Sequence, residues 1–134
     1  MGGRRVIELP GVKHRAPILT AVVIDNVLAS SAVFGADPAS GELPDEISDE
    51  ISNIFANIGA VLELAGATAA DVLRMAVFLR DTDYRAVVNE QWLALFPHAD
   101  DRPARHITIL EILPARAQIE FLAVLAARRE GTDS

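Results

Sequence analysis

Two charged residues in apolar segments near the C-terminal end of the sequence are the first candidates for chemistry. Arg105 directly precedes the apolar run 106–112, and Glu120 lies in a second run, 118–125, after the turn residues 113–116. Both runs predict largely buried strands, and a buried charge normally has an ionic partner or a ligand. A guanidinium fits a carboxylate with two parallel hydrogen bonds, and a carboxyl group can transfer protons. Arg105 and Glu120 are therefore the candidate binding and catalytic residues.

The rest of the sequence limits the possible chemistry. It contains no cysteine, which excludes disulfides, thiolate metal sites and a cysteine nucleophile. None of its three histidines, His14, His98 and His106, has another histidine or a cysteine at i+3 or i+4. We therefore expect no metal site.

Composition restricts the partners. The 134 residues suit one domain, and a net charge of −7 disfavours nucleic acid. No apolar run approaches the roughly 20 residues of a membrane span, and no signal-peptide region follows the N-terminal residues 1–5. These features predict a soluble, cytoplasmic protein without a membrane partner. Because 51% of the residues are hydrophobic, we expect some apolar surface to be buried in a homo-oligomer.

The first half of the sequence predicts three strands and a long helix. Residues 6–9 suit a short strand, and 21–24 with 27–34 suit a hairpin around the turn pair Asp25 and Asn26. Apolar residues then recur at intervals of three and four over 44–65. Acidic residues in the first turns and Gly66 after the last turn mark the ends of this helix.

The second half predicts a strand over 71–80, covered on most of both faces, and a helix over 84–96, followed by the strands 106–112 and 118–125. The order β-β-β-α-β-α-β-β indicates an α+β domain, residues 1–134, in which two helices cover one face of a mixed sheet. The uncovered face is expected to meet an identical subunit. Residues 128–134 are expected to fray.

Several short strings, taken in order, resemble the Rid/YjgF family of reactive-intermediate deaminases. They are DPASGE at 37–42, NIGAVLELAG at 57–66, VFLRD at 77–81, VNE at 88–90, RPAR at 102–105, LP at 113–114 and IE at 119–120. The resemblance extends from about residue 16 to residue 126. It is carried by the joint order and spacing of the strings, because no single string is specific.

The resemblance implies a YjgF, chorismate-mutase-like fold in a trimer, in which three sheets form a central barrel and the substrate clefts lie between subunits. It also implies hydrolysis of 2-imino acids, or their enamine tautomers, to 2-keto acids and ammonia without a metal or organic cofactor. Arg105 and Glu120 match the arginine and glutamate of the family. Asn89 matches an asparagine of its second helix, and Ser31 matches the serine of a Ser-Gly-Gln string.

Three departures from the family pattern alter the expected pocket. Ile18 stands where the family commonly has a tyrosine, so an aromatic hydroxyl is missing. Ala32 and Val33 follow Ser31 in place of Gly-Gln, and Ile107 replaces a small residue or cysteine. The expected substrate-binding residues are Arg105, Ile107, Asn89, Ser31, Ala32 and Ile18. These departures suggest an altered substrate.

In the mechanism implied by the resemblance, Arg105 holds the substrate carboxylate. Glu120 and main-chain groups near Ile107 hold the attacking water, and Glu120 passes a proton to the departing ammonia.

Each of these residues also has a purely structural interpretation. Arg105 and Glu120 could be partners in ion pairs, Asn89 could bond a loop, and Ser31 could contribute backbone only. His106 alternates to the face opposite Arg105, where it would be packed or interfacial. Arg102 would be solvated, and Trp92 and Phe96 would lie in the core.

Three functions follow from these observations. The first is a homotrimeric, cofactor-independent imine or enamine deaminase. The second is a deaminase of an aminomuconate-like enamine, which would suit an altered pocket. The third is a non-catalytic trimer that binds small carboxylates or partner proteins, which the absence of the tyrosine at Ile18 favours.

Overall fold

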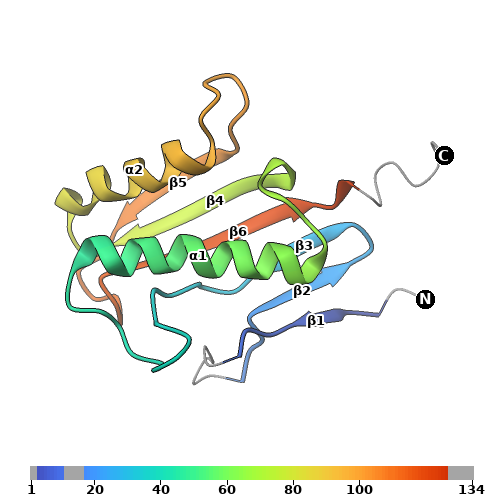
Figure 1. Cartoon of the computed structure of the whole chain (residues 1–134), viewed down its shortest axis with the longest axis horizontal. Coiled ribbons are helices and arrows are strands. Elements are labelled where there is room, and N and C mark those ends of the chain that lie inside the picture. The colour runs from blue at the N-terminus through green and yellow to red at the C-terminus, as the bar shows by residue number, and fades with distance from the viewer. Residues whose placement is uncertain (1–2, 11–16, 127–134) are drawn as a thin grey trace.

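The structure is a computed structural model that describes residues 3–10 and 17–126, and it combines β-strands with two α-helices (Figure 1). In chain order the elements are β1 (Arg5–Ile7), β2 (Ala21–Ile24), β3 (Val27–Ser30), α1 (Ile47–Ala65), β4 (Val72–Leu79), α2 (Arg85–Leu95), β5 (Ala104–Ile109) and β6 (Ala117–Val124). Short 3-10 turns at Ala69–Asp71 and Thr82–Tyr84 precede β4 and α2. The predicted order β-β-β-α-β-α-β-β is confirmed. The predicted tail, 128–134, lies outside the described residues.

The six strands form one mixed sheet in the spatial order β1-β2-β3-β6-β4-β5. Only β4 and β5 pair in parallel, and α2 makes the crossover between them. This connection leaves β5 at the edge of the sheet. Both helices lie on the same side of the sheet, as predicted (Figure 1).

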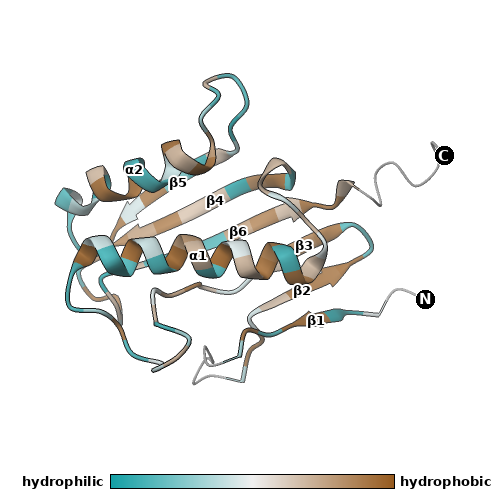
Figure 2. Cartoon of the chain, in the orientation of Figure 1, coloured by the Kyte–Doolittle hydropathy of each residue, from teal (hydrophilic) through white to brown (hydrophobic). Residues whose placement is uncertain are grey.

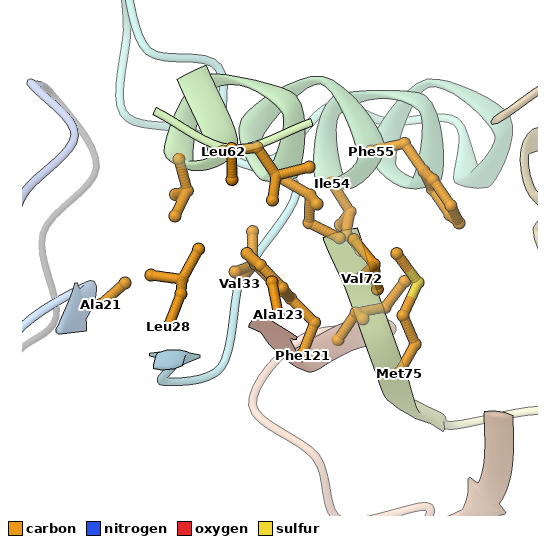
Figure 3. Close-up of a cluster of buried hydrophobic side chains, with 14 of the residues drawn as sticks. Ala21, Leu28, Val33, Ile54, Phe55, Leu62, Val72, Met75, Phe121 and Ala123 are labelled. Atoms are coloured by element: carbon orange, nitrogen blue, oxygen red, sulfur yellow. The ribbon is translucent and has the colours of Figure 1, made fainter. Parts of the chain in front are cut away.

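The core lies between α1 and the sheet (Figure 3). The predicted spacing of apolar residues gives α1 one hydrophobic side, visible as alternating colours along the helix in Figure 2. Ile51, Ile54 and Ile58 on that side are completely buried. They pack over the inward-facing residues of the strands, among them Leu28 and Phe121.

The ends of α1 show which boundary signals were sufficient. Gly66 adopts φ +79°, and its N–H donates to the carbonyl of Glu63, so the predicted stop is confirmed. The helix begins at Ile47, three residues later than predicted. The carbonyls of Pro44 and Asp45 accept hydrogen bonds from the Arg116 guanidinium, which holds these residues outside the helix.

The predicted bounds of two strands in the first half of the chain were wrong. β1 is Arg5–Ile7 rather than 6–9, because only these residues pair with β2. β3 ends at Ser30 rather than at residue 34, since beyond it only Val33 makes an isolated bridge, to Ile119.

The strand predicted over 106–112 was also wrong, both in its bounds and in its expected burial. β5 is Ala104–Ile109, and it ends where its pairing partner β4 ends. It is partly exposed because it has a strand neighbour on one side only.

The sheet face opposite the helices is uncovered within one chain. It carries mainly apolar residues in alternating positions of the strands: Val6, Val22, Ile24, Val27, Ala29, Ala76, Phe78 and Leu122. The prediction that strand 71–80 is covered on most of both faces was therefore wrong for a single chain. No helix in the described part of the chain is long and apolar enough to cross a membrane.

Candidate functional site

Arg105 lies beneath α2, on the helix-covered face of edge strand β5. Its partner in the β4 register is the buried Met75, so both side chains point toward the helices. The Arg105 Nη1 atom donates a 2.9 Å hydrogen bond to the Asn89 Oδ1 atom. The centre of the guanidinium lies 4.7 Å from the centroid of the Trp92 ring. Two residues of α2 therefore fix the position of this cation.

Trp92 is itself held firmly. It is 8% exposed, and its ring meets the Phe96 ring edge-on at 4.8 Å between centroids. A cation over an indole face is attracted by the ring quadrupole. Trp92 and Phe96 are core residues as predicted, and Trp92 also orients Arg105.

The guanidinium is partly buried and keeps most of its donors. Burial and, to a smaller extent, the positive charge of Arg85 lower the pKa of Arg105. A guanidinium has five N–H donors, and among the described residues only one of them has a hydrogen-bond acceptor, on Asn89. No carboxylate in the described part of the chain forms an ion pair with Arg105. The group can therefore receive an external carboxylate.

Ile107 lies on the same face of β5, two residues after Arg105. It pairs with Val77 and packs partly buried against the core beneath α2. We refer to Arg105, Asn89, Trp92 and Ile107 as the Arg105 group. The interpretation of Asn89 as a residue that bonds a loop was wrong, because its side-chain oxygen binds Arg105.

Glu120 lies on the opposite face of the sheet from Arg105. In the register of β4, Arg105 shares a row with Met75 and Phe121, whereas Glu120 shares the next row with Ala76 and His106. The two strands are separated by β4, so the side chains are also roughly 10 Å apart laterally. Arg105 and Glu120 do not meet within one chain.

The expected burial of Glu120 was wrong for a single chain. Glu120 is exposed because its neighbours Ile119 and Phe121 point to the other face of β6. Its carboxylate lines a shallow depression on the uncovered face together with Ser30, Arg74, Ala76, Phe121 and Leu122. His106 is likewise exposed on that face.

Ile18 and Ser31 come together at the end of β3. With Ser30 they line a second depression, which is bordered by Val22 and Ala29. Ser30 therefore lines both this depression and the one that holds Glu120. We refer to Ile18, Ser30, Ser31 and Glu120 as the Ser30 group. Ala32 directly follows Ser31 in the sequence.

The hydroxyl of Ser31 is already used. Its Oγ atom donates to the carbonyl of Leu19 at 2.7 Å, and its backbone N–H donates to the carbonyl of Thr20 at 2.9 Å. Ser31 thus fixes the segment that presents Ile18, which is 48% exposed. The structure brings the predicted residues together as two separate groups.

Two contributors were not identified as such from the sequence. Trp92 orients Arg105, and Arg85 is near enough for its charge to act on Arg105. The signal was available, because Arg85, Asn89 and Trp92 are spaced i, i+4 and i+7 along α2. Arg102, expected to be solvated, donates to the carbonyl of Phe96 at 2.8 Å. Within residues 3–10 and 17–126, no three metal-ligating side chains are grouped.

Comparison with known proteins assigns the chain to a family. The sequence model described as endoribonuclease L-PSP matches residues 12–127. A 2-iminobutanoate/2-iminopropanoate deaminase of Escherichia coli is 28% identical over 113 residues, covering 84% of this chain and 88% of that protein. The protein of the same name from Bos taurus is 33% identical over 111 residues, covering 81% and 80%.

A solved structure shows the same fold. RidA from an Antarctic Psychrobacter superposes with a TM-score of 0.82 at 27% identity, covering 90% of this chain and 99% of that one. The sequence match and the shared architecture agree with the family strings in the sequence. The chain therefore belongs to the Rid/YjgF family of proteins.

Proposed function

We propose that the protein is a cofactor-independent hydrolase that converts 2-imino acids, or their enamine tautomers, into 2-keto acids and ammonia. The observation that carries the proposal is the guanidinium of Arg105, fixed by Asn89 and Trp92 with its other donors open. Such a group suits the carboxylate that every 2-imino acid carries. The deaminase names of relatives that cover most of this chain support the same chemistry.

The anchor would also position the reacting carbon. In a 2-imino acid the imine carbon is bonded to the carboxylate carbon, so gripping the carboxylate fixes the site of attack near Ile107. Holding a water near this carbon replaces a bimolecular encounter by a positioned reaction. A protonated imine is already a strong electrophile, so this positioning is the main requirement.

We further propose that the complete site forms between two copies in a homotrimer. Arg105 and Glu120 lie on opposite faces of the sheet, so one chain cannot direct both at a single substrate. In a neighbouring copy, the Ser30 group would face the Arg105 group across the subunit contact. The uncovered and largely apolar sheet face supports such an assembly, because burying it removes exposed apolar surface from water.

In this site, Glu120 of one copy would accept and donate the protons of the reaction. Water adds to the imine carbon, and Glu120 accepts a proton from it. Glu120 then delivers this proton to the nitrogen, and the carbon–nitrogen bond breaks with its electron pair leaving on ammonia. The hydroxyl proton passes to the ammonia, through Glu120, as the keto group forms. The balance is one iminium and one water to one keto acid and one ammonium.

Ile18 and Ile107 would shape the pocket. Ile18 presents an apolar side chain at the rim of the Ser30 group, in place of the family tyrosine. Ile107 occupies the face beside Arg105, where a smaller residue is common in the family. Backbone groups of Ser31 and Ala32 would complete the wall, since the Ser31 hydroxyl is bonded to Leu19.

The experiment generates the imino acid in place with an amino-acid oxidase and follows the release of keto acid. We expect the protein to accelerate the release, and Arg105→Ala to abolish the acceleration. Glu120→Gln is expected to lower turnover about 10²- to 10⁴-fold. The matched control is Arg102→Ala. It removes an arginine of the same segment whose hydrogen bonds within the described residues go to backbone carbonyls.

The outcomes separate the possible functions. Parental rates in both the Arg105 and the Glu120 variants would refute this mechanism. Carboxylate binding that depends on Arg105, without acceleration of any imine, would indicate the non-catalytic binding protein instead. Cleavage of RNA, the activity named in the description of the family model, is disfavoured by the net charge of −7.

A further inference from the structure

Arg85 is a cation at the start of α2. It directly follows the 3-10 turn Thr82–Tyr84, which Asp81 caps and which contains Asp83. Its side chain is exposed, and no carboxylate within the described residues forms an ion pair with it. Because neither Asp81 nor Asp83 pairs with it, the Arg85 guanidinium is open to a ligand.

Arg85 also stands beside the proposed carboxylate anchor. It lies one helical turn before Asn89 and two turns before Trp92, the two residues that hold Arg105. Burial and the charge of Arg85 both lower the pKa of Arg105, which means that the two guanidinium groups repel each other. Two like charges on the same side of the site suit a ligand that carries two negative charges.

We infer that the substrate is a dicarboxylate, a 2-imino acid or enamine whose second carboxylate binds Arg85 while the first binds Arg105. This inference rests on the proposed function, since it names the substrate class of the same site. Asn89, which binds Arg105, lies one helical turn, about 5.4 Å along the axis, from Arg85, so a ligand held by Arg105 reaches Arg85 by extending along α2. The substitution of Ile for the family tyrosine at residue 18 fits a pocket adapted to a different substrate.

A substrate with a single carboxylate explains these features less well. It would occupy the open donors of Arg105 and leave Arg85 with an unpaired charge next to it. The two carboxylates of a dicarboxylate neutralise both cations and remove their mutual repulsion when the ligand binds. Arg85 would therefore contribute to selectivity between substrates of different charge.

The test compares imino acids that differ by one carboxylate. An alanine-oxidising and an aspartate-oxidising enzyme supply the monocarboxylate and the dicarboxylate imine, and kcat/KM is measured for each. We expect the parent protein to favour the dicarboxylate. Arg85→Gln should lower kcat/KM for the dicarboxylate about 10- to 100-fold, the loss of one charge-assisted hydrogen bond, and change that for the monocarboxylate less than about threefold.

Two further variants serve as controls. Arg85→Lys keeps the charge and should recover part of the preference for the dicarboxylate. Ala56→Glu shifts the net charge by the same amount as Arg85→Gln, on the exposed side of α1, and should leave the preference unchanged. Thermal unfolding of each variant verifies that it is folded.

Binding of the keto acids separates this inference from the proposed function. Calorimetry with oxaloacetate and pyruvate should show tighter binding of oxaloacetate that depends on Arg85. If neither imine is accelerated but this binding preference holds, the deaminase function fails and the dicarboxylate site stands. Equal losses on both substrates, no loss on either, or a change of oligomeric state in Arg85→Gln would overturn the inference, the last by assigning Arg85 to a subunit contact.

Discussion

A buried ion pair joins the loop between β5 and β6 to the start of α1. The Arg116 Nε atom donates to the Glu50 Oε1 atom at 2.5 Å, and Glu50 is completely buried. The same guanidinium donates to the carbonyls of Pro44 and Asp45. The other oxygen of Glu50, Oε2, has no hydrogen-bond partner within the described residues. Arg116 is therefore the main compensation for a carboxylate inside the fold.

Removing Arg116 should be costly for this reason. In Arg116→Met the Glu50 carboxylate stays out of contact with water and loses its counter-charge, and such a change destabilises proteins by about 3 to 5 kcal/mol. In Glu50→Met the cost should be smaller, because the Arg116 side chain is 25% exposed and keeps its two carbonyl acceptors. The double variant should recover at least about 1 kcal/mol relative to Arg116→Met, since it no longer buries an unpaired charge.

Urea unfolding followed by circular dichroism measures these differences. Protein concentration is held fixed, because association raises apparent stability. Arg102→Met is the matched control, since it removes an arginine bonded only to backbone carbonyls, and it should cost about 1 kcal/mol. A cost below about 1 kcal/mol for Arg116→Met, or a double variant no more stable than Arg116→Met, would show that the pair does not compensate the buried carboxylate.

Three more outcomes can be measured with the same variants and assays. Gly35→Ala should destabilise the protein by about 1 to 3 kcal/mol, because the new Cβ would lie 2.1 Å from the Glu50 carbonyl oxygen. Gly59→Ala should instead stabilise α1 by up to about 1 kcal/mol, since no atom lies within 4 Å of its new Cβ. Equal urea midpoints for the two variants would contradict this. Arg105→Met should abolish activity with little change in melting temperature at neutral pH, because it removes a charge that burial and Arg85 disfavour but also the hydrogen bond to Asn89 and the contact with Trp92; retained activity would refute the reasoning. Asn89→Ala should lower kcat/KM about tenfold with little change in melting temperature, because it removes the only hydrogen-bond acceptor of the Arg105 guanidinium among the described residues. An unchanged kcat/KM would show that Asn89 does not position Arg105.

The order of elements could be predicted because it depends on neighbours in the sequence. Apolar residues at intervals of three and four predicted α1, and the glycine needed for a left-handed end predicted its last residue. The errors came where a distant residue intervenes. α1 begins late because Arg116, 72 residues after Pro44, binds the carbonyls that precede it.

The residue types of the candidate site could likewise be predicted, but not their arrangement. Arg105 was found as a charge directly before one apolar run and Glu120 as a charge within another, and both were expected to be buried. The edge position of β5 and the alternation of side chains along β6 place one under α2 and leave the other exposed. The pattern along one strand does not specify which residue of the next strand lies opposite. Whether two charged side chains on different strands share a face of the sheet is therefore not encoded locally.

The sequence by itself determined the elements, their order, the resemblance to the Rid/YjgF family and the residue types able to bind a carboxylate. Tertiary structure alone decided that Asn89 and Trp92 grip Arg105 and that Glu120 lies on the opposite face. Asn89 and Trp92 contact Arg105 because the crossover through α2 places the helix over the edge strand that carries Arg105. Periodicity acts over neighbouring residues, whereas strand register and helix packing join residues far apart in the chain and fix which side chains can meet.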